Sequence, residues 1–308
     1  MHPDSHTCPL CQASPAQTFL ARAFDSPVQG TTVSICACPA CDFAWQWPLA
    51  RTAEQSAEVF QTEYQAERKQ SYFDKERRSA VAALQMDFLD GLEMPVRTLL
   101  DIGCGDGTFV VAAAERGWTA TGLDPALPDQ AALACPQDAA ATPAPRLLRG
   151  MVEQLASDEQ FLCVTLWDVV EHLPDPEPTL AQAWARVAPG GWLVLETGNY
   201  QSTERMLSQQ NWWAWQLDHR WYFAPPTLER LLEPLQFRQS RLAKRSMRPW
   251  SAGPARSQPP SGLQTALSIA KRPWRAAPIS AEHATRRQAA TRWPEWSGLS
   301  IFTLAVQK

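Results

Sequence analysis

The sequence has no long apolar run and no recognisable export segment. A run of roughly 18 uninterrupted apolar residues, which a membrane-spanning helix needs, does not occur, so we expect no such helix. The opening residues, Met1-His2-Pro3-Asp4, provide neither a basic head nor an apolar stretch for a secretory signal, so we expect a cytoplasmic protein. Hydrophobic residues make up 45% of the 308 residues and charged residues 19%, a composition that favours a folded core over disorder.

Positive charge is scarce at the N-terminus and concentrated near the C-terminus. Arg22 is the only Lys or Arg in the first 50 residues, against three Asp, and this disfavours nucleic acid because phosphate binding needs positive charge. Residues 238–297 carry twelve Lys/Arg and two Asp/Glu in a chain of net charge −4. This basic segment could meet an acidic substrate, a nucleic acid or a partner, or it could be a solvated loop.

Five of the eight cysteines lie in the first 41 residues. Cys8 and Cys11 form one C-x2-C pair, Cys38 and Cys41 form a second, and 26 residues separate the pairs. In a chain with no export signal, such pairs indicate metal ligands rather than disulfides. Two of these turns can place four thiolates around one tetrahedral zinc ion, which leaves no open position and gives the metal a structural role.

Alternatives to this ligand set remain open. Cys36 could replace Cys38, and His6 is a weaker competitor; the four thiols could also simply be free in a reducing compartment. The intervening residues read as a short hairpin that includes Thr31–Ile35. A segment of about 45 residues has too little core to fold without such a metal clip.

A helical stretch precedes the most informative part of the sequence. Residues 54–91 contain no proline and predict a helix, broken near 71–74. The spacing of the apolar residues places four of them on one face: Val81, Leu84, Phe88 and Leu92.

A strand and a glycine-rich turn follow. Residues 98–109 read Thr-Leu-Leu-Asp-Ile-Gly-Cys-Gly-Asp-Gly-Thr-Phe, a helix is expected over 108–116, and a second strand, 118–123, ends in Asp124. This order is half of a Rossmann-like unit. The glycines let the backbone approach a ligand closely, and the helix N-terminus offers N–H groups to a carboxylate. Asp124 stands where a carboxylate can accept two hydrogen bonds from a ribose diol.

The glycine spacing distinguishes two ligand classes. A dinucleotide fingerprint is G-x-G-x-x-G, whereas here the third glycine comes one residue early and Asp101 precedes the loop. The segment resembles motif I of the class I S-adenosylmethionine-dependent methyltransferases, whose ligand has an amino-acid end and no phosphate.

The resemblance extends along the chain. The apolar strand 161–167 is followed by Asp168-Val169-Val170-Glu171-His172, which is similar to the family's D-V-x-E-H signature, and Pro-Gly-Gly at 189–191 precedes another apolar strand. Residues 219–223 resemble the H-x-x-x-F segment of bacterial methyltransferases with an N-terminal zinc knuckle. The resemblance covers most of 1–240 and 298–308.

The resemblance implies an α/β fold, a Rossmann-like three-layer sandwich with a mostly parallel seven-stranded sheet, plus a small N-terminal zinc ribbon. The last strand, near 299–307, should run antiparallel. We expect a zinc-ribbon module at 1–48, a helical linker at 49–94 and a methyltransferase domain at 95–308. Within that domain, 245–297 is expected to be a basic Pro- and Trp-rich insertion before the last strand.

The implied cofactor is S-adenosylmethionine. The glycine loop would surround its methionine part, Asp124 would hold the ribose, the segment at 151–153 would meet adenine, and the end of the strand at 167–168 would lie near the sulfonium. The cofactor residues implied in this way are Asp101, Gly103, Cys104, Gly105, Gly107, Asp124, Met151, Val152, Trp167 and Asp168.

Methyl transfer needs alignment of donor and acceptor and, for some acceptors, removal of a proton. His172 and His219 are candidate bases because the pKa of imidazole is near neutral, and Tyr222 is a weaker candidate. His172 could instead make a structural hydrogen bond, and His219 could be packed among aromatics. The indole-rich residues 211–217 could present aromatic faces to a ligand or could form a packed lid.

The sequence therefore predicts S-adenosylmethionine-dependent methyl transfer to a small-molecule acceptor, such as a sugar, a secondary metabolite or a cell-envelope intermediate. One alternative is an RNA methyltransferase that uses the zinc ribbon and the basic segment to hold RNA. Another is a non-catalytic scaffold that retains the fold.

Overall fold

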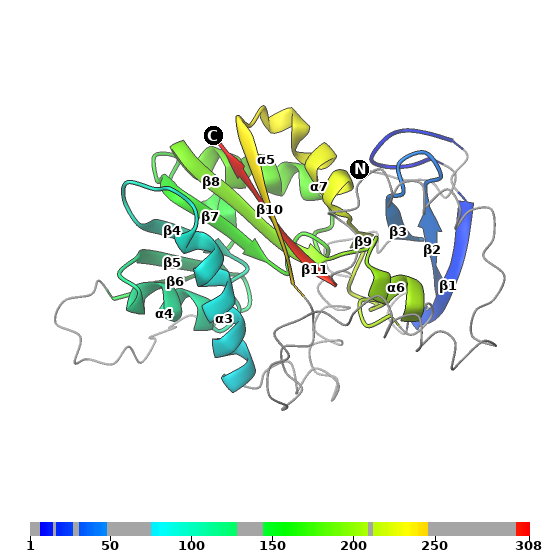
Figure 1. Cartoon of the computed structure of the whole chain (residues 1–308), viewed down its shortest axis with the longest axis horizontal. Coiled ribbons are helices and arrows are strands. Elements are labelled where there is room, and N and C mark those ends of the chain that lie inside the picture. Colours follow the sequence, from blue (N-terminus) through cyan, green and yellow to red (C-terminus); the bar gives the residue numbers. More distant parts are fainter. Residues whose placement is uncertain are drawn as a thin grey trace, which may run out of the picture.

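The structure is a computed structural model with two β-sheets (Figure 1). It describes residues 7–14, 17–26, 31–47, 75–127, 144–208, 212–245 and 300–308. The larger sheet has the strand order β10-β11-β8-β7-β4-β5-β6, and the smaller has the order β1-β2-β3-β9. None of the described helices is long and apolar enough to cross a membrane.

The larger sheet is mostly parallel. Its strands are β4 (Thr98–Ile102), β5 (Thr119–Asp124), β6 (Arg146–Arg149), β7 (Phe161–Trp167), β8 (Val187–Gly198), β10 (Gln239–Arg245) and β11 (Ile301–Gln307). Strands β4 to β8 pair in parallel, whereas β11 is antiparallel to β8 and β10 is antiparallel to β11. The expected seven-stranded sheet and its antiparallel last strand are confirmed.

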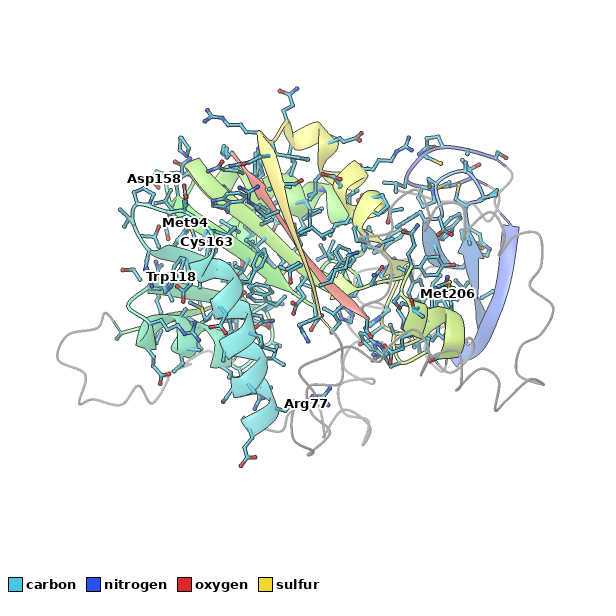
Figure 2. All side chains as sticks on the ribbon, viewed as in Figure 1. Arg77, Met94, Trp118, Asp158, Cys163 and Met206 are labelled. Atoms are coloured by element: carbon cyan, nitrogen blue, oxygen red, sulfur yellow. The ribbon has the colours of Figure 1, made fainter. Side chains whose placement is uncertain are left out.

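Helices cover both faces of this sheet. The described helices are α3 (Lys75–Asp90), α4 (Thr108–Glu115), α5 (Pro176–Arg186), α6 (Thr203–Ser208) and α7 (Pro225–Leu232), with short 3-10 turns at Val152–Gln154 and Glu233–Leu235, and α6 lies beside the smaller sheet instead (Figure 1). Successive strand residues point to opposite faces. Leu99 packs with α3 and α4, as do the buried Trp118 and Cys163 that Figure 2 labels, whereas Leu100 packs with α5 and α7. The result is the expected three-layer sandwich.

The face of α3 expected to be buried is confirmed in part: Leu92 is buried and Phe88 packs against the same apolar cluster as Met86, but Leu84 does not. Leu84 is 42% exposed, and the buried face is made by Ala82, Gln85, Met86 and Leu89. The burial of Gln85 is tolerated because its side-chain amide donates a hydrogen bond to Glu196 Oε1, 3.0 Å away. A buried polar residue breaks the apolar periodicity, which is why the pattern placed Leu84 on the buried face. The part of the expected helix at 54–74 lies outside the described residues.

The smaller sheet joins the N-terminal part of the chain to a strand from its second half. It contains β1 (Gln17–Ser26), β2 (Thr31–Ala37), β3 (Ala44–Trp47) and β9 (Trp221–Tyr222). Strands β1 and β2 form the expected antiparallel hairpin. Strand β3 then pairs with β9, Ala44 opposite Tyr222 and Trp45 opposite Trp221, so a strand from the second half of the chain completes the N-terminal sheet.

Strand β10 was not anticipated by the sequence, which indicated only a basic segment there. It ends at Arg245, the first residue of the expected insertion. Residues 246–299, which include most of the basic segment 238–297 that the RNA alternative invoked together with the zinc ribbon, lie outside the described residues.

Candidate functional site

The glycine loop joins β4 to α4 at the carboxyl edge of the sheet. Gly103, Gly105 and Gly107 have φ angles of +77°, +56° and +81°, a left-handed conformation that favours glycine. A Cβ on Gly103 would lie 2.5 Å from Val169 Cγ2, and one on Gly107 would lie 2.8 Å from Leu147 Cδ1. A Cβ on Gly105 would meet no described atom within 4 Å. Gly105 is thus the point of the loop that a ligand can approach.

Asp124 ties the end of β5 to this loop. Its Oδ2 accepts a hydrogen bond from the Gly105 N–H at 2.9 Å, and its Oδ1 accepts one from the Ala126 N–H at 2.8 Å. Each carboxylate oxygen has two lone pairs, so the side chain retains capacity for two hydroxyl donors. This geometry suits a diol held beside the loop.

Asp101 is the buried carboxyl under the loop. It is 1% exposed, and its Oδ1 accepts a hydrogen bond from the Thr165 hydroxyl at 2.7 Å. Burial, with a smaller contribution from the charge of Asp124, raises the pKa of Asp101 to about 8. A cationic ligand placed nearby would favour its ionised form.

The other sequence-predicted cofactor residues follow neighbouring strands at the same edge. Met151 and Val152 follow β6, with Met151 46% exposed and Val152 buried. Trp167 ends β7 and packs edge-on against Phe109, with ring centroids 5.1 Å apart, and Asp168 follows it with a φ of +52°. Ligands of open α/β sheets bind outside the carboxyl ends of the strands, so these residues lie at the edge of the sheet where such ligands bind. Cys104 lies within the loop, and burial raises the pKa of its thiol.

A carboxylate and two imidazoles converge beyond β7. One ligand atom from each of Glu171, His172 and His219 lies within 4.8 Å of the other two. The two rings meet edge to face, with centroids 4.7 Å apart. His172 Nδ1 is 2.9 Å from the backbone carbonyl oxygen of Asp218 and 3.7 Å from its Oδ2. The structure therefore brings both candidate bases together.

Glu171 is the member of this cluster that the sequence did not single out. It is 3% exposed, one carboxyl oxygen accepts a hydrogen bond from Thr197, and Oε2 is buried with no hydrogen-bond partner among the described residues. Burial, and then the charges of Asp168 and Asp218, raise its pKa well above the usual value. Glu171 is part of the D-V-V-E-H motif, but only the contacts in the folded structure show that one of its carboxyl oxygens has no hydrogen-bond partner among the described residues.

Tyr222 belongs to a different group of side chains. It is 2% exposed, packs against Trp212, Trp215 and Tyr200, and its hydroxyl accepts a hydrogen bond from Gln46 at 3.4 Å. Burial raises its pKa above the ordinary value. Trp212 and Trp215 pack with Ile35, Ala37 and Ala44 of the smaller sheet, which is the packed-lid interpretation of the indole-rich segment.

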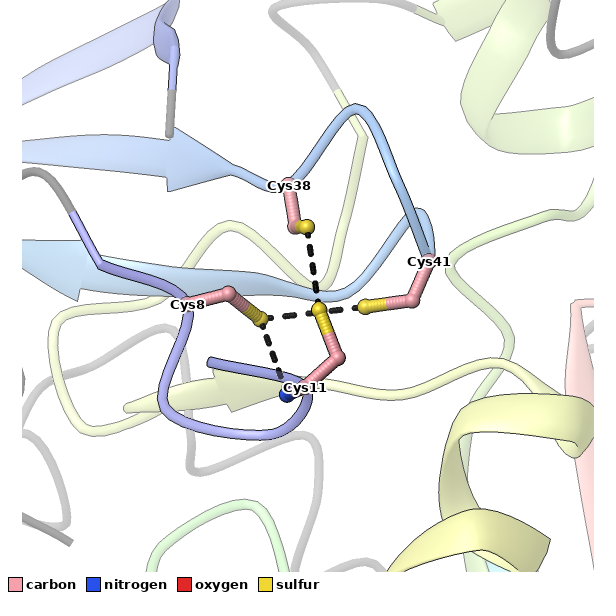
Figure 3. Close-up of side chains that lie close together, drawn as sticks. All are labelled: Cys8, Cys11, Cys38 and Cys41. Carbon is pink, nitrogen blue, oxygen red and sulfur yellow. Dashed lines mark hydrogen bonds between the residues drawn. The ribbon is translucent and has the colours of Figure 1, made fainter. Parts of the chain in front are cut away.

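The four cysteines of the two C-x2-C pairs also converge (Figure 3). The Sγ atoms of Cys8 and Cys41 are 3.7 Å apart, those of Cys11 and Cys38 are 3.5 Å apart, and all four lie within 4.8 Å of one another. None of these four is in a disulfide. Cys36 lies in β2, so the cluster contains Cys38 in its place. His6 lies outside the described residues.

The two turns that carry these sulfurs have the same backbone. Cys8 N–H donates to the Ala13 carbonyl and Cys38 N–H to the Phe43 carbonyl, each at 2.9 Å. The residue after each pair, Gln12 or Asp42, has a φ of +61°. The sequence thus repeats one local conformation, and the repeat aims four sulfurs at a common point.

Comparisons with known proteins bear on this site. A family model described as Methyltransferase domain matches residues 64–239. The chain is 36% identical over 129 residues to the Ubiquinone biosynthesis O-methyltransferase of Paracidovorax citrulli, covering 41% of this chain and 54% of the relative. Its counterpart of the same name from Chromobacterium violaceum is 31% identical over 129 residues, covering 41% and 55%. The chain spans about half the length of the curated relatives it matches.

Solved structures give a more distant likeness. A SAM dependent methyltransferase from Archaeoglobus fulgidus is 18% identical with a TM-score of 0.48, over 75% of this chain and 94% of that one. A SAM-dependent methyltransferase from Thermotoga maritima, described as a possible histamine N-methyltransferase, is 15% identical with a TM-score of 0.49, over 82% and 99%. The family match itself spans the glycine loop, Asp124 and the cluster around Glu171. This chain therefore belongs to the methyltransferase domain family.

Proposed function

We propose that the chain transfers a methyl group from S-adenosylmethionine to an oxygen of a small molecule. The observation that carries this proposal is the glycine loop held to Asp124 by the Gly105 N–H at 2.9 Å, with open space over Gly105. A loop of this kind can hold a ligand against its backbone while the carboxylate binds hydroxyls.

The residues at the cleft edge fit this cofactor. Asp124 would bind the ribose diol, the backbone from Gly103 to Gly107 would enclose the methionine part, and Met151 and Val152 would meet adenine. Trp167 and Asp168 would stand near the sulfonium. When bound, the cofactor supplies a methyl group activated by a positively charged sulfur. The buried carboxyl of Asp101 would favour that positive charge, because the ionised carboxylate and the positively charged sulfur would stabilise each other.

The acceptor side of the cleft would be the cluster of Glu171, His172 and His219. Val169, which contacts Gly103 in the loop, lies two residues before Glu171, so the cluster adjoins the donor site. The acceptor oxygen would attack the methyl carbon as the carbon–sulfur bond breaks, and the electron pair of that bond would stay on sulfur. The acceptor must also lose its hydroxyl proton, and this cluster is placed to promote that loss.

The curated relatives support oxygen as the acceptor atom. Both are named as O-methyltransferases and are 31–36% identical over the matched region. An oxygen acceptor also agrees with a cluster of imidazoles and a carboxyl, since a hydroxyl needs deprotonation to become a strong nucleophile.

We further propose that Cys8, Cys11, Cys38 and Cys41 bind a structural zinc ion. Zinc–sulfur bonds of about 2.3 Å place tetrahedral sulfurs about 3.8 Å apart, close to the separations of 3.5 and 3.7 Å seen here. The zinc turn that carries Cys38 and Cys41 leads into β3, and β3 pairs with β9 just after His219. The metal would thereby support the acceptor side of the cleft.

The direct test uses the full chain with methyl-labelled S-adenosylmethionine and bacterial metabolite extracts. We expect label to appear on a hydroxyl group of a small molecule, and Asp124→Ala to abolish the transfer. Label entering added RNA instead would contradict the proposed acceptor class. Cofactor binding without any methyl transfer would favour a scaffold.

A further inference from the structure

We propose that Glu171, His172 and His219 form a binding site for a divalent first-row transition-metal ion, separate from the four-cysteine cluster. The inference rests on the proposed function in one respect: the ion would act on the acceptor hydroxyl of that same cleft. The metal-binding claim itself can be tested without cofactor or acceptor.

The donor set and its geometry suit such an ion. Two imidazoles and one carboxyl each offer a ligand atom, and these atoms lie within 4.8 Å of one another. Two histidines and a carboxylate bind divalent metals such as Fe²⁺ and Zn²⁺, and three protein ligands leave coordination positions open for another molecule. The cysteine cluster, in contrast, fills a tetrahedron by itself.

The carboxyl group of this cluster contains a buried oxygen that is unsatisfied. Glu171 is 3% exposed, and its Oε2 has no hydrogen-bond partner within the described part of the chain. Burying such an oxygen without a partner is unfavourable, so it is rare in folded proteins. A bound cation would be the missing partner of this carboxyl oxygen.

Neighbouring groups already hold the ligands as they are held in metal sites. A backbone carbonyl only accepts hydrogen bonds, so the 2.9 Å contact with the Asp218 carbonyl places the His172 proton on Nδ1. The lone pair then lies on Nε2, the nitrogen that would bind the ion. Thr197 donates to the Glu171 carboxyl. Histidine and carboxylate ligands of metals typically have outer partners of these kinds.

The surrounding charge also favours a cation. Asp168 and Asp218 both act on Glu171 as like charges. A divalent ion would reverse this repulsion, since a bound cation is the largest local charge in its site. Electrostatics and hydrogen bonding therefore lead to the same conclusion.

The consequence for the reaction is a specific acceptor class. An open coordination position would take a hydroxyl oxygen, and the cation would lower the pKa of that hydroxyl so that its proton is lost to solvent near neutral pH. The oxygen–carbon bond then forms as the carbon–sulfur bond breaks. The acceptor would be a small molecule with a hydroxyl able to reach the ion, and the histidines would be ligands rather than bases.

The test uses Mn²⁺ alone as the probe, on the zinc-loaded full chain without cofactor. Electron paramagnetic resonance measures free Mn²⁺, and elemental analysis verifies that zinc stays at one per chain. We expect one Mn²⁺ bound per chain. Glu171→Gln, which keeps the shape of the side chain, should weaken binding by more than about 100-fold, and Thr197→Val by about 10–100-fold, as expected for an outer partner.

Glu177→Gln is the matched control, because it makes the same substitution at an exposed position six residues further along; it should bind Mn²⁺ like the unaltered chain. Absence of Mn²⁺ binding by the unaltered chain at millimolar concentration would overturn the proposal. So would equal binding by Glu171→Gln, provided that its circular dichroism is native. Failure of S-adenosylmethionine binding would count against the proposed function and would leave the Mn²⁺ result standing.

Discussion

At the scale of single residues, the three loop glycines share a conformation but differ in surroundings. Gly103 faces Val169 and Gly107 faces Leu147, whereas Gly105 faces open space. The first two are needed so that the loop can pack against the β7 and β6 sides of the sheet. Gly105 is needed where a ligand would approach. Substitutions should therefore distinguish the packing role of Gly103 and Gly107 from the ligand-binding role of Gly105.

We predict that Gly105→Ala lowers S-adenosylmethionine affinity more than stability. The left-handed φ of +56° makes alanine cost about 1–2 kcal/mol of folding free energy, and the new methyl group would occupy cofactor space. Gly117→Ala is the control, since Gly117 has a φ of +83° and comparable open space at the end of α4. Thermal melts and calorimetry should show similar destabilisation in both variants and weaker cofactor binding only in Gly105→Ala. Equal affinities would remove Gly105 from the site.

Asp101 makes the stability of the cofactor-free chain depend on pH. The pKa of Asp101 is about 8 in the folded chain and about 4 in the unfolded chain. Between these two pH values, the folded chain holds a proton that the unfolded chain has lost. Stability therefore falls as pH rises through this range, by up to about 1.4 kcal/mol per pH unit. Asp101→Asn cannot ionise, so its melting temperature relative to the unaltered chain should rise from about pH 5 to about pH 8. Parallel curves for the two proteins would contradict this burial effect.

The position of a residue in the fold is predictable from the sequence where a motif fixes the backbone. The Gly-x-Gly-x-Gly spacing located the loop, and the strand that follows it ends at Asp124, which accepts a hydrogen bond from Gly105. The unsatisfied oxygen of Glu171 could not be foreseen, because it depends on what surrounds the side chain in three dimensions. Tyr222 illustrates the same limit: it follows His219 by three residues, yet its ring packs in an aromatic group with Trp215.

At the scale of elements, the two-residue strand β9 links the cysteine turns to the acceptor side. Trp221 pairs with Trp45 of β3, and its backbone N–H donates to the Glu171 carbonyl at 3.3 Å. Its ring stacks on Phe43, which follows the second cysteine pair, with centroids 6.0 Å apart. Loss of order in the cysteine turns would therefore reach Glu171 and His219 through one short strand.

We predict that Cys38→Ser removes the zinc ion and disturbs the acceptor side while the cofactor side stays intact. Zinc content should fall from one per chain to none, and near-ultraviolet circular dichroism of the tryptophans should change. S-adenosylmethionine affinity should stay within about threefold, since the glycine loop is built on the other sheet.

Cys36→Ala is the matched control for the zinc prediction. Because Cys36 lies in β2 outside the four-sulfur cluster, this variant should retain one zinc ion per chain. If Cys36→Ala lost the zinc ion and Cys38→Ser kept it, the ligand would be Cys36, and the assignment of Cys38 would be wrong.

Elements with a clear apolar period were predictable, and those without one were not. The expected strands at 118–123, 161–167 and 299–307 lie within two residues of the observed ends of β5, β7 and β11. Strand β10 reads Gln-Ser-Arg-Leu-Ala-Lys-Arg, and its basic residues resemble a solvated segment because β10 is an edge strand. Its stability comes from pairing with β11, which a local pattern does not show.

At the scale of the whole molecule, the strand order places the two ends of the undescribed segment side by side. Arg245 at the end of β10 is the pairing partner of Ile301 at the start of β11. The side chain of Arg245 also forms an ion pair with Glu196 at 2.7 Å. A short connection could therefore join these two strands without altering the sheet.

We predict that replacing residues 250–296 with a short Gly-Ser linker leaves the cofactor affinity unchanged within about twofold and the melting temperature within a few degrees, because Arg245 and Ile301, which flank the segment, are already paired neighbours in the sheet. Calorimetry and thermal melts measure both. Loss of cofactor binding would show that this segment is part of the cleft.

The central claim is that the cleft at the edge of the larger sheet binds S-adenosylmethionine through the glycine loop and Asp124. Isothermal calorimetry on the full chain tests it most directly, with Asp87→Ala, an exposed carboxylate on α3, as the control for removing a charge. We predict one bound S-adenosylmethionine per chain and a loss of affinity of at least about tenfold in Asp124→Ala, as expected for charge-assisted hydrogen bonds worth about 1.5–3 kcal/mol. Absence of binding, equal affinity in Asp124→Ala, or tighter binding of a nicotinamide dinucleotide would contradict it.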